Sequence, residues 1–166
     1  MRIRTADDAD WPQIYPFYSV VMAEEKTYPF PPDQTPDEAK PWWMESPPGR
    51  TVVAVDGDTV VGSAKMGPNR PGRGAHIATA SFLVDPAHRG RGIGRALGDH
   101  VIEWCRSQGF HGIQFNAVVS VNHPAVHLWQ ALGFEIVGTV PDAFDHPDHG
   151  LVGLHVMYRS LQPPVW

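Results

Sequence analysis

Apolar residues recur along the chain with two different periods, which predict helices in some segments and strands in others. Between Gly92 and about Gln108 an apolar residue returns at every fourth position, as on the buried face of a helix. These four residues are Ile93, Leu97, Val101 and Cys105. In RTVVAVDGDTVVGSAKM, two β-branched runs flank the pair Asp56 and Gly57, which predicts a tight hairpin.

Capping residues mark where the earlier helices begin. Asp7 or Asp8 can cap a first helix that runs to about Glu25, after a short strand in MRIRTA. In TPDEAKPWWM, Thr35 and Glu38 have the spacing of a capping box, which predicts a second helix. The segment HPAVHLWQAL has a Pro near its start and a Gly after its end, so we expect a further helix there.

The remaining apolar segments predict strands. They are AHIATASFLV, HGIQFNAVV, FEIVGTV and GLVGLHVMYRSL. Between the last two, PDAFDHPDHG is expected to be a loop rich in His and Asp. The predicted order is strand, helix, helix, three strands, helix, strand, helix and two strands. This order indicates an α/β fold around a mixed sheet rather than a series of βαβ units.

Length and composition limit what this fold can do. The chain has 166 residues, which is typical of one domain covering residues 1–166. A lone Cys105 cannot form a disulfide within the chain, which fits the reducing cytoplasm. A net charge of −5 argues against nucleic acid as a partner. We expect neither a signal peptide nor a membrane association, since no apolar run approaches the ~20 residues that span a bilayer.

Positive charge is concentrated in one segment. Between Arg70 and Arg95 there are five Arg and one acidic residue, whereas the rest of the chain holds 8 basic and 17 acidic residues. Within it, DPAHRGRGIGRALGDH leads from a predicted strand into the helix that begins near Gly92. Helix N-termini bind anions, glycines let a phosphate approach, and Arg side chains add charge-assisted hydrogen bonds. The segment predicts either a diphosphate site or a solvated Arg-rich loop, and its spacing fits neither a P-loop nor a dinucleotide fingerprint.

The pattern Arg89-x-x-Gly92-x-Gly94 is similar to the (Q/R)-x-x-G-x-(G/A) signature of the GNAT superfamily of acyl-CoA-dependent N-acyltransferases. Its surroundings are similar as well, because SFLV stands before it and NHPAVHLWQALGF after it resembles the second block of that family. The resemblance covers essentially the whole chain. It implies a mixed, mostly antiparallel central sheet that is flanked by helices and splayed at the coenzyme A site.

The resemblance also implies a cofactor and the residues that hold it. Acetyl-CoA is the implied acyl donor, with its pyrophosphate on the loop backbone and its pantetheine arm beside the preceding strand, as in β-augmentation. The implied loop and strand residues are Arg89, Gly90, Arg91, Gly92, Ile93, Gly94, Arg95, Phe82, Leu83 and Val84. Asn122 and Trp129 are further implied cofactor contacts, although Asn122 is also placed to cap the following helix.

The implied reaction is a direct attack of an amine on a thioester. It needs a base for the ammonium proton and a backbone N–H, expected near Leu83 or Val84, for the oxyanion. His76 and His123 are the candidate bases, because AHIATASFLV contains no carboxylate. Asn116 is a candidate for polarising the substrate or for holding its carboxylate.

The proton for the leaving thiolate has no assigned donor. Many family members carry a Tyr acid where this chain has Trp129, and an indole cannot supply a proton near neutral pH. A thiol pKa near ~8.5 makes an acid dispensable, and Tyr158 is an alternative donor. Thr79 and Ser81 form a candidate pair facing the substrate, since alternate residues of a strand share a face.

Two functions stay open at this point. The first is a cytoplasmic acetyl-CoA-dependent N-acetyltransferase for a small amine or amino acid, and the second is a CoA-binding module for regulation or assembly with little catalysis. No metal is expected, because HPDH lacks a fixed geometry, and Asp142 and Asp145 beside it are expected to attract an ammonium group. The loop TYPFPPDQ and the pair Trp42-Trp43 either wall the acceptor pocket or pack a helix. A homodimer is compatible with the resemblance.

Overall fold

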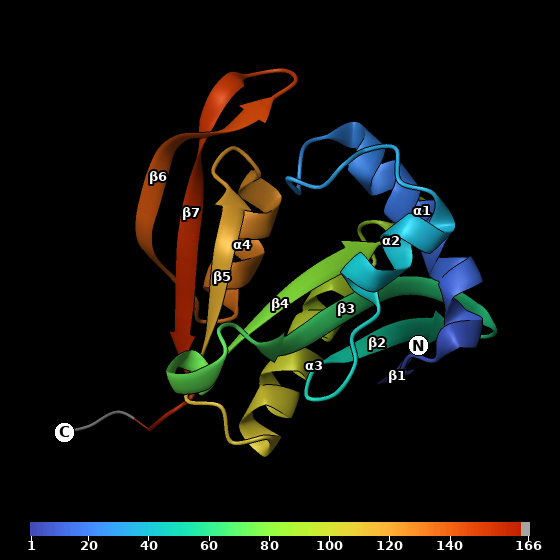
Figure 1. Cartoon of the computed structure of the whole chain (residues 1–166), viewed down its shortest axis with the longest axis horizontal. Coiled ribbons are helices and arrows are strands. Elements are labelled where there is room, and N and C mark those ends of the chain that lie inside the picture. The colour runs from blue at the N-terminus through green and yellow to red at the C-terminus, as the bar shows by residue number, and fades with distance from the viewer. Residues whose placement is uncertain (164–166) are drawn as a thin grey trace.

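Seven strands form one twisted sheet within residues 1–163, the part of the chain that the computed structural model describes (Figure 1). The strands are β1 (Arg2–Thr5), β2 (Arg50–Asp56), β3 (Thr59–Pro68), β4 (Ile77–Val84), β5 (Gly112–Val119), β6 (Glu135–His146) and β7 (Gly150–Ser160). The helices are α1 (Trp11–Glu24), α2 (Pro36–Trp43), α3 (Ile93–Ser107) and α4 (His123–Ala131). This is the order of strands and helices that the sequence predicts, so the predicted architecture is confirmed.

The sheet is antiparallel except at its centre. Its strands lie in the order β1-β2-β3-β4-β5-β7-β6, and only the neighbours β4 and β5 run parallel within the described residues. These two strands pair where Ile77 faces Gly112 and Ala78 faces Ile113. Beyond that point they diverge, and Figure 1 shows them as the two arms of a V. The predicted mostly antiparallel sheet and its splay are therefore both confirmed.

Helices cover both faces of the sheet because each strand divides its side chains between them. Val53 and Val55 of β2 join the buried cluster beneath α1 and α2, whereas Val52 and Ala54 join the cluster beneath α3 and α4. The C-terminal end of α1 and the N-terminal end of α3 thus approach the same splay from opposite faces. The tight turn of the β2–β3 hairpin contains Gly57 in a left-handed conformation, as the Asp-Gly pair predicts.

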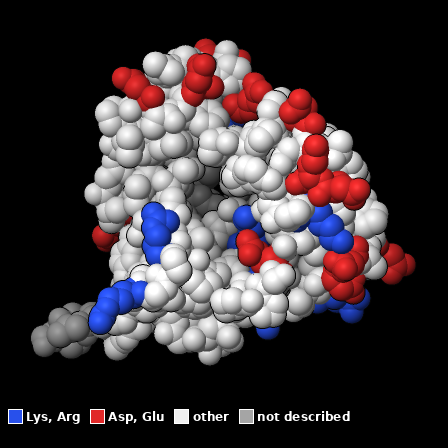
Figure 2. Space-filling model, viewed as in Figure 1, with Lys and Arg blue, Asp and Glu red and all other residues white. Residues whose placement is uncertain are grey.

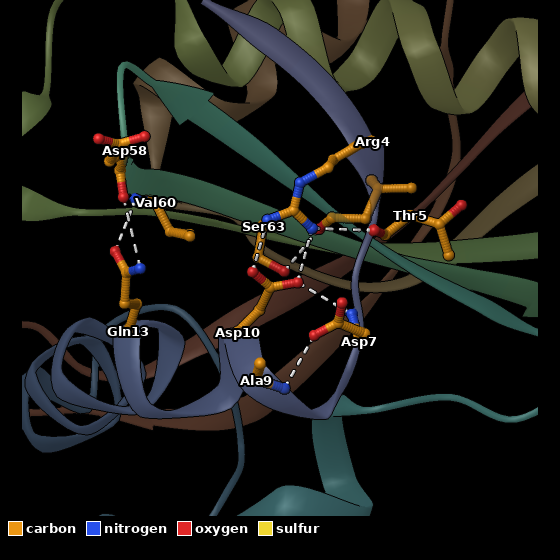
Figure 3. A network of polar contacts seen from close by, with 10 residues as sticks. Arg4, Thr5, Asp7, Ala9, Asp10, Gln13, Asp58, Val60 and Ser63 are labelled. Carbon is orange, nitrogen blue, oxygen red and sulfur yellow. Dashed lines mark hydrogen bonds and ion pairs between the residues drawn. The ribbon is translucent and has the colours of Figure 1, made fainter.

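Local capping interactions set the beginnings of α1 and α2. The Thr35 hydroxyl and the Glu38 carboxylate form the predicted capping box at the start of α2. Before α1, Asp10 is 4% exposed, and its carboxylate receives two hydrogen bonds of 2.7 Å from the Arg4 guanidinium (Figure 3). This pairing joins β1 to α1, and the hydrogen bonds from Arg4 hold the pKa of Asp10 below its usual value.

The prediction of a loop at PDAFDHPDHG is wrong. Strand β6 continues to His146 and forms a long hairpin with β7, in which Phe144 faces Val152 and His146 faces Gly150. The turn itself is confined to residues 147–149. The strand tolerates Pro141, which lacks an N–H, because the pairing register shifts between Val140 and Phe144. Turn-forming residue types here build a bulge rather than ending the strand.

Candidate functional site

The glycine-rich loop presents free backbone amides at the start of α3. Gly90 and Gly92 have φ angles of 76° and 75°, a left-handed conformation that strains other residues. Gly92 is the N-cap of α3, and no side chain among the described residues caps this end. The first N–H groups of the helix are therefore available to an anion, and the positive end of the helix dipole lies there.

The arginine side chains of this loop already have acidic partners. Arg89 lies 3.2 Å from a carboxylate oxygen of Glu24, and Arg91 lies 2.8 Å from one of Asp56. Arg95 contacts Asp99 on its own helix at 3.8 Å. These ion pairs are largely exposed, so they are weak and their guanidinium groups can exchange partners. The backbone, rather than the side chains, is the preformed part of this candidate anion site.

A channel of about 600 Å³ leads from this loop toward the splay. Its walls come from the end of α1 and the residues after it, from β4, from the glycine-rich loop, from the start of α4 and from the tip of the β6–β7 hairpin. The lining residues that matter below are Thr27, Phe82, Val84, Gly92, Asn122 and His146. Figure 2 shows a hollow near the centre of this face of the molecule.

The peptide groups that face the splay come from alternate residues of β4. The N–H of Asp85 donates to the carbonyl of Val61 on β3 at 3.0 Å, and Leu83 is paired with Ser63 on the same strand. In an antiparallel pair, the residues between such positions turn their N–H and C=O away. Phe82 and Val84 therefore face the gap, whereas Leu83 does not. Leu83 lines the channel, but its peptide groups pair with β3, so its expected contact with a cofactor stays a prediction that does not involve these peptide groups.

Tyr28, on the segment between α1 and α2, fills part of this gap. Its hydroxyl accepts a hydrogen bond from the N–H of Phe82 at 2.8 Å and donates one to the carbonyl of Phe82 at 2.6 Å. Burial raises the pKa of Tyr28 to about 12, although the hydrogen bond with Phe82 acts in the opposite direction. The phenol therefore stays protonated at neutral pH.

A second cavity, of about 440 Å³, opens on the other side of the splay. Thr79, Ser81 and Asn116 line it, so the structure brings these predicted substrate-facing residues together. Its charged lining residues are Glu45, Lys65 and Arg70, with a Glu45 carboxylate oxygen 3.5 Å from the Lys65 ammonium. Both signs of charge thus meet around one cavity.

A smaller cavity of about 250 Å³ lies between the other two. It shares Phe82 and Asn122 with the channel, and it shares Thr79, Ser81 and Asn116 with the charged cavity. The three hollows therefore adjoin through the splay. A molecule in the channel and a molecule in the charged cavity would meet between β4 and β5.

Asn116 and Asn122 stand at the two sides of this junction. Asn116 lies in an irregular stretch of β5, where the register with β7 shifts, and its amide donates to Asn69 Oδ1 at 2.6 Å. Asn122 caps α4, since its Oδ1 lies 3.4 Å from the N–H of Ala125. Asn122 also lines the channel, so its amide group is available there as well.

Trp129 is part of an aromatic cluster behind the splay. Its ring centroid lies 4.5 Å from that of Phe82 and 4.9 Å from that of Phe115, and the residue is 8% exposed. The ring also borders the small cavity. Packing against these rings is a sufficient reason for an aromatic residue at position 129, and it does not depend on a contact with a ligand.

Several predicted residues lie away from these cavities. His76 precedes β4 at the end opposite the glycine-rich loop, where its ring lies beside that of His111, and His123 is exposed at the start of α4. The Tyr158 hydroxyl lies against Gly112, beside the paired end of β4 and β5. None of the three is a lining residue of the described cavities, and the same holds for Asp142 and Asp145.

The two aromatic segments expected as a wall behave differently. Trp43 is fully buried and donates through Nε1 to Ser63 Oγ at 2.9 Å, so it packs the core. Tyr28 and Phe30, from TYPFPPDQ, line the small cavity. In HPDH, His146 is 6% exposed and lines the channel rather than the charged cavity.

Sequence reasoning missed Glu45, and it pointed to Tyr28 and His146 only through the segments TYPFPPDQ and HPDH that contain them. Each comes from a segment between or at the end of regular elements, and no spacing marks it. The only signal in the sequence was composition, an aromatic run before α2 and a His-rich turn. In residues 1–163, no group of three or more His, Cys, Asp or Glu side chains is arranged to hold a metal. Over the same residues, no helix has the length and apolar character needed to cross a bilayer.

Comparison with known proteins shows which proteins this chain is similar to. The model of the acetyltransferase (GNAT) family matches residues 16–134. N-acetyltransferase aca1 of Schizosaccharomyces pombe is 32% identical over 76% of this chain, which spans 66% of that relative's length. The L-methionine sulfoximine/L-methionine sulfone acetyltransferase of Salmonella typhimurium is 31% identical, and the alignment covers 85% of this chain and 84% of that protein.

Solved structures of similar proteins share the whole fold. A GCN5-related N-acetyltransferase from Kribbella flavida is 56% identical, with a TM-score of 0.93 over 96% of this chain and 97% of the other. The structure of yncA, a putative acetyltransferase from Salmonella typhimurium with its cofactor acetyl-CoA, is 25% identical. It has a TM-score of 0.81 over 100% of this chain and 96% of the other.

Proposed function

The chain belongs to the acetyltransferase (GNAT) family, and from that membership we propose that it transfers an acetyl group from acetyl-CoA to the amino group of a small molecule or amino acid. The observation that carries this proposal is the splay of β4 from β5. It joins a channel that begins at free helix amides to a cavity that holds both signs of charge. A two-substrate transfer needs such a meeting point.

The donor takes the channel in this proposal. The diphosphate binds the backbone amides from Gly90 to Arg95, and the amide arm lies along the peptide groups of β4 that face the gap, chiefly those of Val84. The Asn122 amide binds the arm from the other side. The similar yncA structure, which is described with its cofactor acetyl-CoA, supports this choice of donor.

The acceptor takes the charged cavity. An amino acid carries a carboxylate and an ammonium group, and the lining offers Lys65 and Arg70 for the first and Glu45 for the second. Asn116 is placed to hold the acceptor at the junction. The similarity to an acetyltransferase of L-methionine sulfoximine supports an acceptor of this class.

The chemistry uses few side chains. When bound, acetyl-CoA supplies the thioester that the acceptor amine attacks. Glu45 accepts the ammonium proton, directly or through water, because it is the carboxylate that borders the acceptor. The N–H of Phe82 is the next gap-facing donor beyond Val84, so it can stabilise the oxyanion that forms on the thioester at the end of the arm. Trp129 acts only by packing, since a thiolate leaves adequately near neutral pH.

An assay of thiol release tests the proposal. Acetyl-CoA is incubated with the protein and with a panel of free amino acids, amino-acid analogues, small amines without a carboxylate, and carboxylic acids without an amine. We expect release only with amines, and faster release with amino acids than with the amines that lack a carboxylate. Binding of CoA without release on any acceptor would instead support a CoA-binding module for regulation or assembly.

A further inference from the structure

The hydroxyl of Tyr28 makes the hydrogen bonds to Phe82 of β4 that a neighbouring strand would make. A residue of a paired antiparallel strand would accept from the N–H of Phe82 with its carbonyl and donate its own N–H to the carbonyl of Phe82, and the phenol makes both of these hydrogen bonds. The geometry is tight, at 2.8 Å to the nitrogen and 2.6 Å to the oxygen. One side-chain hydroxyl thus satisfies both peptide groups that Phe82 turns toward the splay.

An extended ligand that pairs with β4 needs the same groups. Phe82 and Val84 are the residues at this end of β4 whose peptides face the gap, as the pairing of Leu83 with Ser63 requires. Phe82 borders both the channel and the small cavity that leads to the acceptor side. A peptide N–H has one proton, so Tyr28 and a ligand cannot both receive its full hydrogen bond.

We propose that Tyr28 is a displaceable substitute for the acyl-donor arm, which holds Phe82 in the donor-free protein and leaves when the donor binds. This inference rests on the proposed function, because it takes the donor to be an amide-containing thioester of coenzyme A. Tyr28 is then a positioning residue that sets how far the donor arm can advance. The arm first pairs with Val84, and it reaches the acceptor side only after it has taken Phe82 from the phenol.

The segment that carries Tyr28 is suited to such an exchange. Its ring stacks on Phe30 of the same segment, with centroids 5.3 Å apart, so the two rings can move together. An exposed ion pair of 2.9 Å between Lys26 and Asp148 holds the segment at one end. Exposed ion pairs of this kind are weak. The hydrogen bonds lost by Tyr28 are replaced on Phe82 by those of the donor, so Phe82 has hydrogen-bond partners both before and after the exchange.

Removal of the hydroxyl separates this role from a merely structural one. In Tyr28→Phe, the N–H and C=O of Phe82 lose their partner in the donor-free protein, and the donor regains that partner on binding. We therefore expect a lower melting temperature without ligand and about tenfold tighter binding of acetyl-CoA, the size of one hydrogen bond that no longer has to be broken. Adenosine diphosphate, which lacks the arm, should bind both proteins equally.

The control is Tyr15→Phe. The Tyr15 hydroxyl donates to the carbonyl of Gln34 at 2.8 Å, at the other end of the same segment, and it does not touch Phe82. We expect this variant to lose some stability and to bind acetyl-CoA like the wild type. Tyr28→Leu, which removes the hydroxyl by a different change, should bind acetyl-CoA more tightly than the wild type, as Tyr28→Phe does.

Isothermal titration calorimetry on the four proteins, with acetyl-CoA and with adenosine diphosphate, decides the matter. Tighter binding of acetyl-CoA alone by the Tyr28 variants supports the proposal. Equal or weaker binding by these variants overturns it, and so does an equal gain for adenosine diphosphate. If the wild type binds no acetyl-CoA, the proposed function fails first and this inference fails with it, so the two failures are distinguishable.

Discussion

Gly92 is the position at which the proposed diphosphate site can be tested most directly. Its φ of 75° is left-handed, and a side chain there would project into open space beside the channel. A carboxylate at this position would lie next to the first amides of α3 and would take the place of the diphosphate. Gly92→Glu should therefore abolish donor binding without disturbing the core.

The magnitude follows from the hydrogen bonds at stake. If the diphosphate loses two charge-assisted hydrogen bonds, each worth ~1.5–3 kcal/mol, its dissociation constant rises by ~100-fold or more. The left-handed backbone adds a strain of ~1–2 kcal/mol in any variant, which lowers the melting temperature by a few degrees, about 2–4 °C per kcal/mol at this chain length. Strain alone does not weaken binding, so the two effects are separable.

Gly109→Glu is the matched control. Gly109 follows the other end of α3, with a φ of 79° and open space around it, so the same strain and the same charge are introduced away from the channel. Calorimetry with CoA should give a lost or strongly weakened affinity for Gly92→Glu and an unchanged affinity for Gly109→Glu. Wild-type affinity in a folded Gly92→Glu protein would refute the placement of the diphosphate.

Three further predictions concern the base, the aromatic cluster and the pH dependence of stability. Glu45→Gln should lower kcat by ~100-fold with little change in CoA affinity, whereas Glu103→Gln on the exposed face of α3 should leave both unchanged; equal kcat values in a steady-state assay would exclude Glu45 as the base. Trp129→Phe should keep turnover within about threefold of the wild type, while Trp129→Ala should cost ~3–5 kcal/mol of unfolding free energy, measured by urea denaturation. Because Arg4 lowers the pKa of Asp10, its carboxylate stabilises the fold above the unfolded pKa near ~4, and this contribution disappears as the pH falls through the lowered value. The stability advantage of the wild type over Asp10→Asn should therefore be full at pH 7 and shrink below about pH 4; a constant difference between the two melting temperatures would contradict this.

Local signals predicted much of the fold because they act over a few residues. The capping box of Thr35 and Glu38 and the Asp-Gly turn of the β2–β3 hairpin are found where the sequence placed them. The same reasoning failed for β6, where Pro141 and its acidic neighbours have turn-like composition. There the pairing with β7, a strand of 11 residues, continues past a bulge and decides the structure.

The residues of the candidate site also fall into two groups, those that the sequence could predict and those that it could not. The loop that begins at Arg89 could be recognised because its glycines and its helix lie together in the chain. The proposed base, Glu45, could not be recognised in this way, because the charged cavity that it lines is assembled from β3, β4, β5 and the segment after α2. His76 lies only 13 residues before Arg89 in the chain. In the fold, however, it stands at the paired end of β4, at the opposite end of the strand from Val84.

The sequence by itself determined the order of elements, the glycine-rich loop proposed to bind the diphosphate and the family resemblance, since each depends on residues that are neighbours along the chain. Only the tertiary structure decided which groups face the gap between β4 and β5. Strand register directs the peptide groups of Leu83 to β3 and those of Phe82 to the splay, and the docking of a distant segment brings the Tyr28 hydroxyl onto Phe82. The physical reason is that hydrogen-bond direction alternates along a strand, so a single residue of register determines which amides a ligand can reach.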